Sequence, residues 1–163
     1  MRSSAASDVY KRQIYSVSVN GDGRPPYKNL NTGTFTNKGI EFEARYQICK
    51  NLNLDMNYSY LHMSKPIPGA PGHKFYAGAT YMPGRFTLNV NMQSVFDLYT
   101  DAECSKKEDF TTLNAKVAYR FGTRDKGLNL FVKGENLTAT RYTINDGFPM
   151  PKAIFMGGID VTF

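Results

Sequence analysis

The sequence has no tryptophan, only two cysteines and two histidines, and no long apolar run. Two cysteines in 163 residues are too few for the disulfide framework of a small secreted scaffold. No apolar run approaches the ~18 residues that a transmembrane helix needs, which excludes a helical membrane protein. There is also no nucleophile–base grouping, phosphate loop or zinc spacing, so the sequence predicts no enzyme activity, no cofactor and no metal site.

The composition is that of a folded chain rich in aromatic residues. Hydrophobic residues make up 41% of the sequence, which is too many for a disordered chain, and 11 Tyr and 11 Phe are among them. The length predicts about one domain or part of one. The formal net charge is +6.

The first thirteen residues are set apart from the rest. Met1–Gln13 shows neither strand alternation nor a helical stripe, and SSAASDVYKRQ resembles the in-frame translation of a transposon-based sequencing adapter. We expect residues 1–13 to be such an artefact and residues 14–163 to be the native portion. Leaving out three basic residues and one acidic residue of this segment lowers the net charge from +6 to +4, so the basic composition does not predict nucleic-acid binding.

Period-two alternation runs through most of the chain and predicts strands, because successive side chains of a strand point to opposite faces. In KGIEFEARYQI, apolar residues from Ile40 to Ile48 alternate with charged and polar ones. Similar runs occupy residues 52–60, 74–81, 86–96, 110–121, 128–136 and 153–163, with a weaker one at 14–19. The sequence therefore predicts an all-β, antiparallel fold of about eight strands, with strand charges on one face only.

The connections between these runs alternate in length. Those at residues 49–51, 82–85 and 122–127 are short, whereas those at 20–37, 62–73, 97–109 and about 138–152 are long. Outer-membrane barrels have short periplasmic turns and long outer loops, so this segregation favours a transmembrane β-barrel over a soluble lipocalin-like barrel.

Aromatic residues gather near both predicted membrane edges. Tyr and Phe cluster close to the short turns and again close to the long loops, with an aliphatic band between them. Such girdles are typical of outer-membrane barrels. The predicted inner girdle is Tyr46, Tyr81, Phe86, Tyr119, Phe121 and Phe163; the predicted outer girdle is Tyr58, Tyr60, Phe75, Phe96 and Phe110.

The last strand ends on an aromatic residue. Ile159, Val161 and Phe163 alternate up to the final position, which resembles the signal read by the outer-membrane barrel assembly machinery. We therefore expect these three residues to form a barrel-assembly signal.

Two segments resemble the barrel of TonB-dependent outer-membrane receptors. They are NTGTFTNKGIEFEARYQICKNLNLDMNYSYL and GLNLFVKGENLTATRYTINDGFPMPKAIFMGGIDVTF. In the last hairpin of that family, an Asn-Leu follows the penultimate strand, then a Tyr, a Pro-containing loop and a final strand ending in Phe. Asn136, Leu137, Tyr142 and Phe163 occupy these positions.

The resemblance implies a Gram-negative outer-membrane protein whose 22-stranded barrel surrounds a separate plug. Such receptors import a scarce nutrient, such as a ferric siderophore, haem, cobalamin or a glycan, with energy coupled through TonB. The chain is then a C-terminal barrel fragment without the plug and its TonB-binding segment. The implied partners are outer-membrane lipid, the barrel assembly machinery, TonB through the missing plug, and a nutrient ligand.

Several outer-loop residues are candidate ligand contacts. His62 and His73 flank one predicted loop, Asp101 lies in the next, and Asn145 and Asp146 lie in the last. Solvated loop or turn positions are the simpler explanation and are favoured for all five residues. The two cysteines are expected to be unpaired. Cys49 lies at a short turn and Cys104 in a long loop, so the length of a strand keeps them too far apart for a disulfide.

Three other functions fit parts of the pattern. The first is a complete eight-stranded outer-membrane barrel with a structural or adhesive role. The second is an outer-membrane enzyme that acts on lipid, for which no convincing polar cluster is present. The third is a soluble lipocalin-like binder, which leaves the segregated loops unexplained.

Overall fold

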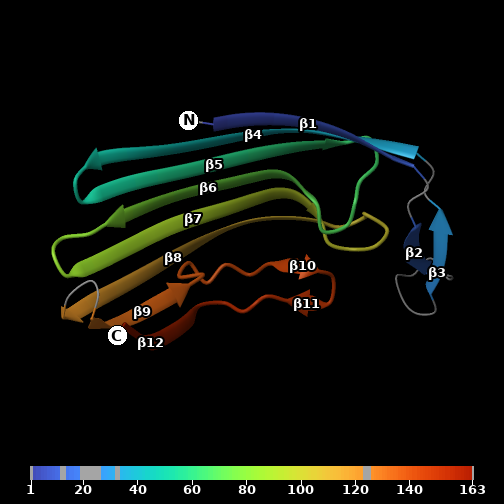
Figure 1. Ribbon diagram of the computed structural model, residues 1–163. Helices are drawn as coiled ribbons and strands as arrows, with labels where there is room; N and C mark the ends of the chain where they lie inside the picture. The colour runs from blue at the N-terminus through green and yellow to red at the C-terminus, as the bar shows by residue number, and fades with distance from the viewer. Residues whose placement is uncertain (1, 12–13, 19–26, 32–33, 123–125, 163) are drawn as a thin grey trace.

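A computed structural model describes residues 2–11, 14–18, 27–31, 34–122 and 126–162. They form one antiparallel eight-stranded sheet and two small two-stranded sheets (Figure 1). No helix in the described part of the chain is long and apolar enough to cross a membrane. The predicted all-β antiparallel fold is confirmed.

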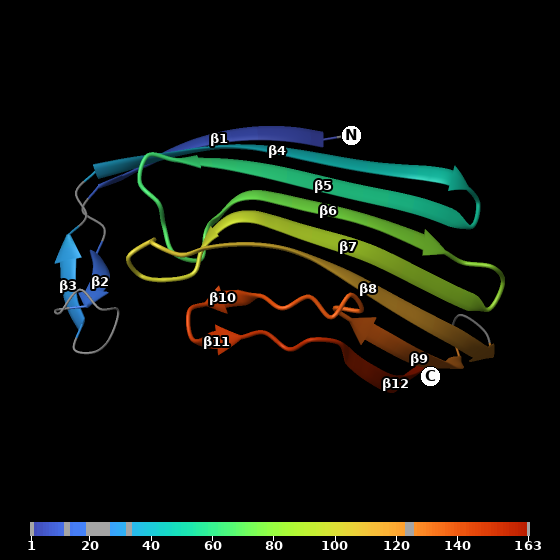
Figure 2. The same ribbon diagram turned by 180° about the vertical axis from the view of Figure 1, so that it is seen from behind.

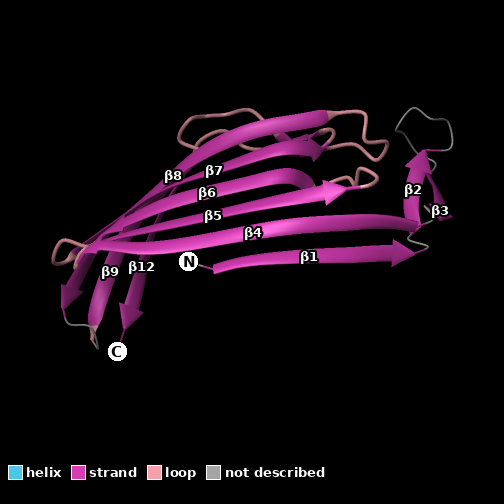
Figure 3. Cartoon of the chain, turned by 90° about the horizontal axis from the view of Figure 1, so that it is seen from above, coloured by secondary structure: helices cyan, strands magenta, loops and turns pink. Residues whose placement is uncertain are grey.

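The large sheet follows the chain as a meander. Its spatial order is β1 (Arg2–Lys11), β4 (Thr34–Cys49), β5 (Leu52–Met63), β6 (Pro71–Tyr81), β7 (Phe86–Tyr99), β8 (Lys107–Gly122), β9 (Gly127–Glu135) and β12 (Ile154–Thr162). The sheet is curved but open, with β1 and β12 at its two edges (Figure 3). Each pair of neighbours is hydrogen-bonded in an antiparallel register.

The short and long connections lie at opposite ends of this sheet, as Figures 1 and 2 show. Two-residue β4–β5 and four-residue β6–β7 connections lie at one end. The long connections, two of which contain the hairpins β2–β3 and β10–β11, lie at the other. We call these the short-turn end and the loop end, and the predicted segregation is confirmed for these connections, whereas the predicted short connection at 122–127 lies partly outside the described residues.

Several strand boundaries differ from the prediction. β4, β7 and β8 run 14 to 16 residues, longer than the predicted strands, and so take residues from the expected loops. Ile14–Ser18 forms β2, which pairs with β3 (Tyr27–Asn31) in a separate hairpin and not in the large sheet. Arg2–Lys11, where the sequence shows no alternation, pairs with the free edge of β4. Backbone pairing at an edge needs no particular side-chain pattern.

Cross-strand register places the apolar residues of the different strands on one face of the sheet. Ile40 lies opposite Tyr60, Leu54 opposite Ala79 and Val90 opposite Ala115. Large side chains on this face remain exposed, with Tyr46 at 69% and Val132 at 61%. Nothing in the described chain covers this face, so burial in lipid satisfies it better than water does.

The opposite face carries the strand charges, including Glu43, Arg45, Lys116 and Lys133. The prediction that strand charges lie on one face only is wrong for Lys38, Lys107 and Asp109, which lie on the apolar face. These three lie at the loop ends of strands that are longer than the 9–11 residues a bilayer requires. A bilayer therefore has room to leave such strand ends outside its hydrocarbon core.

One predicted girdle residue is misplaced. Phe110 lies opposite Val95 on the charged face and is only 9% exposed, so it does not belong to the lipid-facing outer girdle. Successive side chains of a strand point to opposite faces, and Phe110 is three residues from Leu113, so the two point to opposite faces. Phe96 lies on the apolar face and is 43% exposed, as predicted. Phe163 lies outside the described residues.

Candidate functional site: the polar face and the loop end

A ladder of side-chain amides crosses the polar face. Asn89 donates from Nδ2 to Thr80 Oγ1 at 2.9 Å, and Asn91 donates to Asn89 Oδ1 at 3.0 Å. Asn114 then donates to Asn91 Oδ1 at 2.9 Å and accepts from the backbone N–H of Asn136 at 2.9 Å. The ladder therefore joins β6, β7 and β8 to the segment that follows β9. Each amide retains hydrogen-bonding capacity toward the polar side of the sheet.

Two ion pairs on this face each join residues of one strand. Arg45 Nη2 lies 2.8 Å from Glu43 Oε1, and Lys133 Nζ lies 2.5 Å from Glu135 Oε1. Lys116 stands directly opposite Lys133, and its Nζ lies 4.2 Å from the centre of the Phe131 ring. The two lysines are like charges at close range, and these contacts offset their repulsion. The result is a charged, hydrogen-bonding surface.

Asn136 ties the β9–β12 connection to this surface. It is 5% exposed and has a φ of 49°, in the left-handed region that Asn adopts more readily than most residues. Its Nδ2 donates to the carbonyls of Thr140 at 2.9 Å and Pro151 at 3.1 Å, and its Oδ1 accepts from the Thr140 N–H at 3.1 Å. One buried side chain thus holds both ends of the loop that contains β10 (Thr143–Asn145) and β11 (Phe148–Pro149).

A small apolar cluster lies beneath that loop. Val95, Leu98 and Phe110 are buried together, and the Tyr142 ring stacks on Phe110 with centroids 3.9 Å apart. Burial, with a smaller contribution from the Glu135 charge, raises the pKa of Tyr142 above its ordinary value. The loop therefore packs over the polar face and not over the apolar one. The polar face is therefore the face of the sheet that this loop covers.

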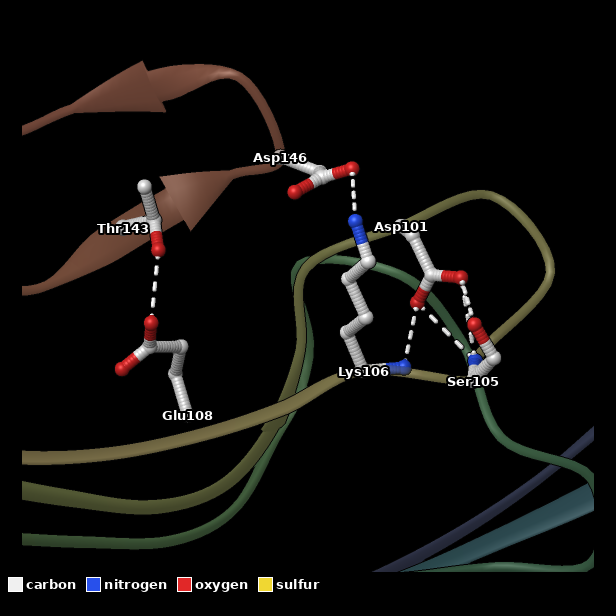
Figure 4. A network of polar contacts seen from close by, with 6 residues as sticks. All are labelled: Asp101, Ser105, Lys106, Glu108, Thr143 and Asp146. Carbon is white, nitrogen blue, oxygen red and sulfur yellow. Dashed lines mark hydrogen bonds and ion pairs between the residues drawn. The ribbon is translucent and has the colours of Figure 1, made fainter.

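Polar contacts join the last two loops at this end (Figure 4). Lys106 Nζ lies 2.6 Å from Asp146 Oδ2, and the Asp146 backbone N–H donates to the Thr100 carbonyl at 2.9 Å. Thr143 Oγ1 donates to Glu108 Oε1 at 2.7 Å. These contacts fix the β10–β11 hairpin against the β7–β8 connection.

Asp101 organises the β7–β8 loop from inside. It accepts hydrogen bonds from Ser105 Oγ at 2.6 Å and from the backbone N–H groups of Ser105 and Lys106 at 2.9 and 2.8 Å. Desolvation opposes ionisation of Asp101, but these hydrogen bonds outweigh it and lower its pKa. The Asp146 carboxylate raises the pKa of Lys106. Both groups are therefore held in their charged forms.

The predicted ligand-facing residues are not gathered into one site. Asp101 and Asp146 both contact Lys106, and Asn145 is exposed in β10. His62 and His73 lie at the loop ends of β5 and β6, on the apolar face, opposite Lys38 and Tyr60. They therefore do not lie on the polar face. No group of three or more metal-ligating side chains is present among the described residues.

The other sequence-predicted positions have structural surroundings. Leu137 is exposed, and its side chain lies over Gly134 on the apolar face. Ile159 and Val161 point from β12 toward the same face and are 63% and 62% exposed. Cys49 and Cys104 are unpaired, as expected, and burial raises the pKa of the Cys104 thiol, as does Asp101.

Sequence reasoning missed the amide ladder and the contacts of Lys106, Glu108 and Thr143. Asn89, Asn91 and Asn114 all stand in the polar phase of their strands, which was a usable signal. Their mutual contact depends on register, which no single strand encodes.

The chain matches the protein family described as "TonB dependent receptor-like, beta-barrel" over residues 4–137. Among solved structures, it is similar to the copper transporter OprC, with a TM-score of 0.80 and 21% identity over 99% of this chain and 28% of that one. The ferric-catecholate import receptor Fiu from K12 E. coli gives a TM-score of 0.70 and 16% identity over 99% of this chain and 25% of that one. BauA, the ferric preacinetobactin receptor from Acinetobacter baumannii, gives a TM-score of 0.68 and 19% identity over 96% of this chain and 26% of that one. The chain thus spans about a quarter of these proteins.

Proposed function

Because the chain belongs to the TonB-dependent receptor-like β-barrel family, whose members are outer-membrane transporters of Gram-negative bacteria and not enzymes, we propose that it forms part of the wall of a nutrient importer. The observation that carries the proposal is the division of the sheet into an exposed apolar face and a hydrogen-bonded polar face. A lipid-embedded wall around a wet lumen requires this division.

The wall belongs to a larger closed barrel. β1 and β12 are the two edges of the sheet and are not paired with each other, and without the segment 1–13 that is proposed below to be foreign, the first edge is β4. An open edge in hydrocarbon leaves backbone N–H and C=O groups unsatisfied, at several kcal/mol each, so further strands must cover both edges. The similarity to proteins about four times as long supports the same proposal.

The cargo is a scarce, bulky nutrient such as a ferric siderophore, haem, cobalamin, a glycan or a copper species. The similar structures are described as transporters or receptors of copper and of ferric siderophores, which supports metal-bearing cargo. Import would need a plug, TonB and the inner-membrane proton gradient. Insertion would use the barrel assembly machinery, with Ile159, Val161 and Phe163 as its recognition signal.

Residues 1–13 are proposed not to be native. The DNA upstream of the Ile14 codon tests this directly. An open frame that continues through further alternating strands to a plug supports the receptor wall. A start codon and signal peptide just upstream of Ile14 would instead support a complete small barrel and remove the case for TonB-coupled import.

Import itself is tested in cells that lack the gene. We expect the deletion strain to lose uptake of one cargo in a panel of radiolabelled ferric siderophores, haem, cobalamin and copper. Complementation should restore uptake only when TonB is present and the proton gradient is intact. Uptake that persists without TonB would contradict the proposal.

A further inference from the structure

Basic and aromatic side chains form a patch at the loop end of the apolar face. Lys38 on β4 lies opposite His62 on β5, and Tyr60 on β5 lies opposite His73 on β6. Cross-strand partners share a face, and positions two apart in a strand do too, so all four lie on the face of Ile40. We call Lys38, Tyr58, Tyr60, His62 and His73 the outer-rim patch.

The patch is arranged to donate hydrogen bonds. Tyr58 Oη lies 2.8 Å from His73 Nδ1, which fixes the imidazole and leaves its Nε2 available. The Tyr60 ring packs on the same imidazole with centroids 4.8 Å apart. Lys38 and His62 are exposed. An ammonium and imidazole N–H groups set among tyrosines match a phosphate at the boundary between water and hydrocarbon.

A hollow of about 480 Å³ lies on the same face and the same three strands. It is lined by the small residues Ala44, Ala77, Gly78 and Ala79 and by the larger residues Tyr46, Leu54, Asp55 and Met56. The lining is almost wholly apolar. A flexible hydrocarbon chain fits such a depression better than a folded protein surface does.

The spacing between the patch and the hollow matches one membrane leaflet. Six residues separate Lys38 from Ala44, which is roughly 20 Å along a strand. With a strand tilt of 35–45°, this corresponds to a depth of about 15 Å, or half of the ~30 Å hydrocarbon core. A headgroup at the patch would therefore place an acyl chain beside the hollow.

We propose that β4, β5 and β6 bind a phosphorylated lipid of the outer leaflet. Its phosphate contacts Lys38, His62 and His73, and one acyl chain lies in the hollow between Ala44, Ala77 and Ala79. The inference rests on the proposed membrane-spanning wall. It assigns to this face a lipid of defined charge and not generic solvation by the bilayer.

The test uses the complete protein that carries this sequence, extracted from outer membranes in mild detergent. Native mass spectrometry measures the lipid retained by the wild type, by a Lys38→Gln/His62→Gln double variant and by Ala77→Leu, which fills the hollow. Lys74→Gln is the matched control, because Lys74 lies beside His73 in β6 but on the opposite face. The proteins are also delipidated and returned to nanodiscs that contain bis-phosphorylated or dephosphorylated lipid A.

We expect wild type and Lys74→Gln to retain phosphorylated lipid, and the double variant and Ala77→Leu to retain at least tenfold less. Rebinding should require the phosphate groups. Equal retention in all variants, rebinding of dephosphorylated lipid, or a bound protein in place of lipid would overturn the inference. Heat-modifiable migration of the wild type reports membrane folding separately, so its absence would count against the proposed wall and not against the patch alone.

Discussion

Phe131 on β9 lies across Gly158 on β12, and its ring occupies the space that a side chain at Gly158 would need. The same ring lies beneath the Lys116 ammonium. Gly158 therefore leaves room for Phe131 on the polar face. Phe131 in turn contacts Lys116, which lies opposite Lys133. Three strands depend on this arrangement.

Gly158→Ala should destabilise the wall by about 1 kcal/mol, near the lower end of the cost of overpacking, because the Phe131 ring can rotate away. The rotation would withdraw the ring from Lys116. Gly157→Ala is the matched control, because a Cβ there meets only the Phe131 carbonyl at 3.7 Å. The measurement is the urea midpoint of the membrane-inserted protein. Equal midpoints for the two variants would contradict the packing argument.

Asn136→Ala should release the β9–β12 connection. The variant loses the hydrogen bonds to Thr140 and Pro151, at about 1–3 kcal/mol for buried polar partners left unsatisfied. It also puts alanine, which has no polar side chain to hydrogen-bond locally, at a φ of 49° in the left-handed region. Amide hydrogen exchange at Thr140 should accelerate.

Two companion substitutions separate these causes. Asn136→Gly fits the left-handed backbone conformation without strain but loses the same hydrogen bonds. Asn136→Asp keeps an acceptor for the Thr140 N–H but sets a carboxylate oxygen against the Thr140 and Pro151 carbonyl oxygens. We expect exchange in both the Ala and the Asp variants to be faster than in the Gly variant. A wild-type rate in the Gly variant would show that the side-chain hydrogen bonds do not hold the loop.

Phe110→Ala should cost about 3 kcal/mol, because the ring is buried and stacked on Tyr142. Phe96→Ala, on the apolar face, should cost less in detergent because Phe96 remains exposed to it. Thermal unfolding of the two variants gives the comparison. A larger loss for Phe96 would place Phe110 at the lipid surface, as the sequence alone suggested.

The contact between the last two loops should persist over a wide pH range. The folded-state pKa of Asp101 is lowered, so its contribution is present above its unfolded value of about 4 and is lost as pH falls through the folded value. The pKa of Lys106 is raised, so its contribution is present below its unfolded value and is lost as pH rises through the folded value, above about 10.5. Proteolysis of the β10–β11 hairpin should therefore be slow between these limits and faster outside them.

Lys106→Met is the variant for this test. It removes the ion pair with Asp146 but leaves the backbone hydrogen bonds to Asp101 intact. Cleavage of the hairpin should rise at neutral pH, by no more than a few-fold, because exposed ion pairs contribute little. The faster cleavage at high pH that we assign to Lys106 should be absent from this variant. If cleavage still accelerates at high pH, another titrating group is responsible.

Deletion of residues 1–13 should leave the pairing from β4 to β12 unchanged. The first strand contacts only β4 in the large sheet, and an exposed edge accepts many sequences. Site-specific spin labels in β5 and β7 should report the same separation with and without the segment. A changed separation would make β1 an integral part of the wall and count against the proposal that the segment is foreign.

The sequence by itself determined the strands and their two faces. Alternation of residues such as Ile40 and Glu41 needs no tertiary contact, because the two faces of a strand follow from backbone geometry. The short turn at Gly84, where φ is 64°, and the turn at Asn145–Gly147 were also visible, because few residues adopt such backbone angles. These local features placed the short and long connections at opposite ends.

Only the tertiary structure decided the features that depend on strand register and on long-range pairing. The ladder from Asn89 to Asn136 exists only because three strands align those positions, and a slip of one residue would turn each amide to the other face. The contact between Lys106 and Asp146 joins residues 40 apart. Phe110 was assigned to the wrong face because an aromatic residue near a membrane edge satisfies a compositional rule from either side. Its pairing with Val95 places it on the polar face, and its stacking on Tyr142 buries it there, since that contact depends on the loop folding over the same face.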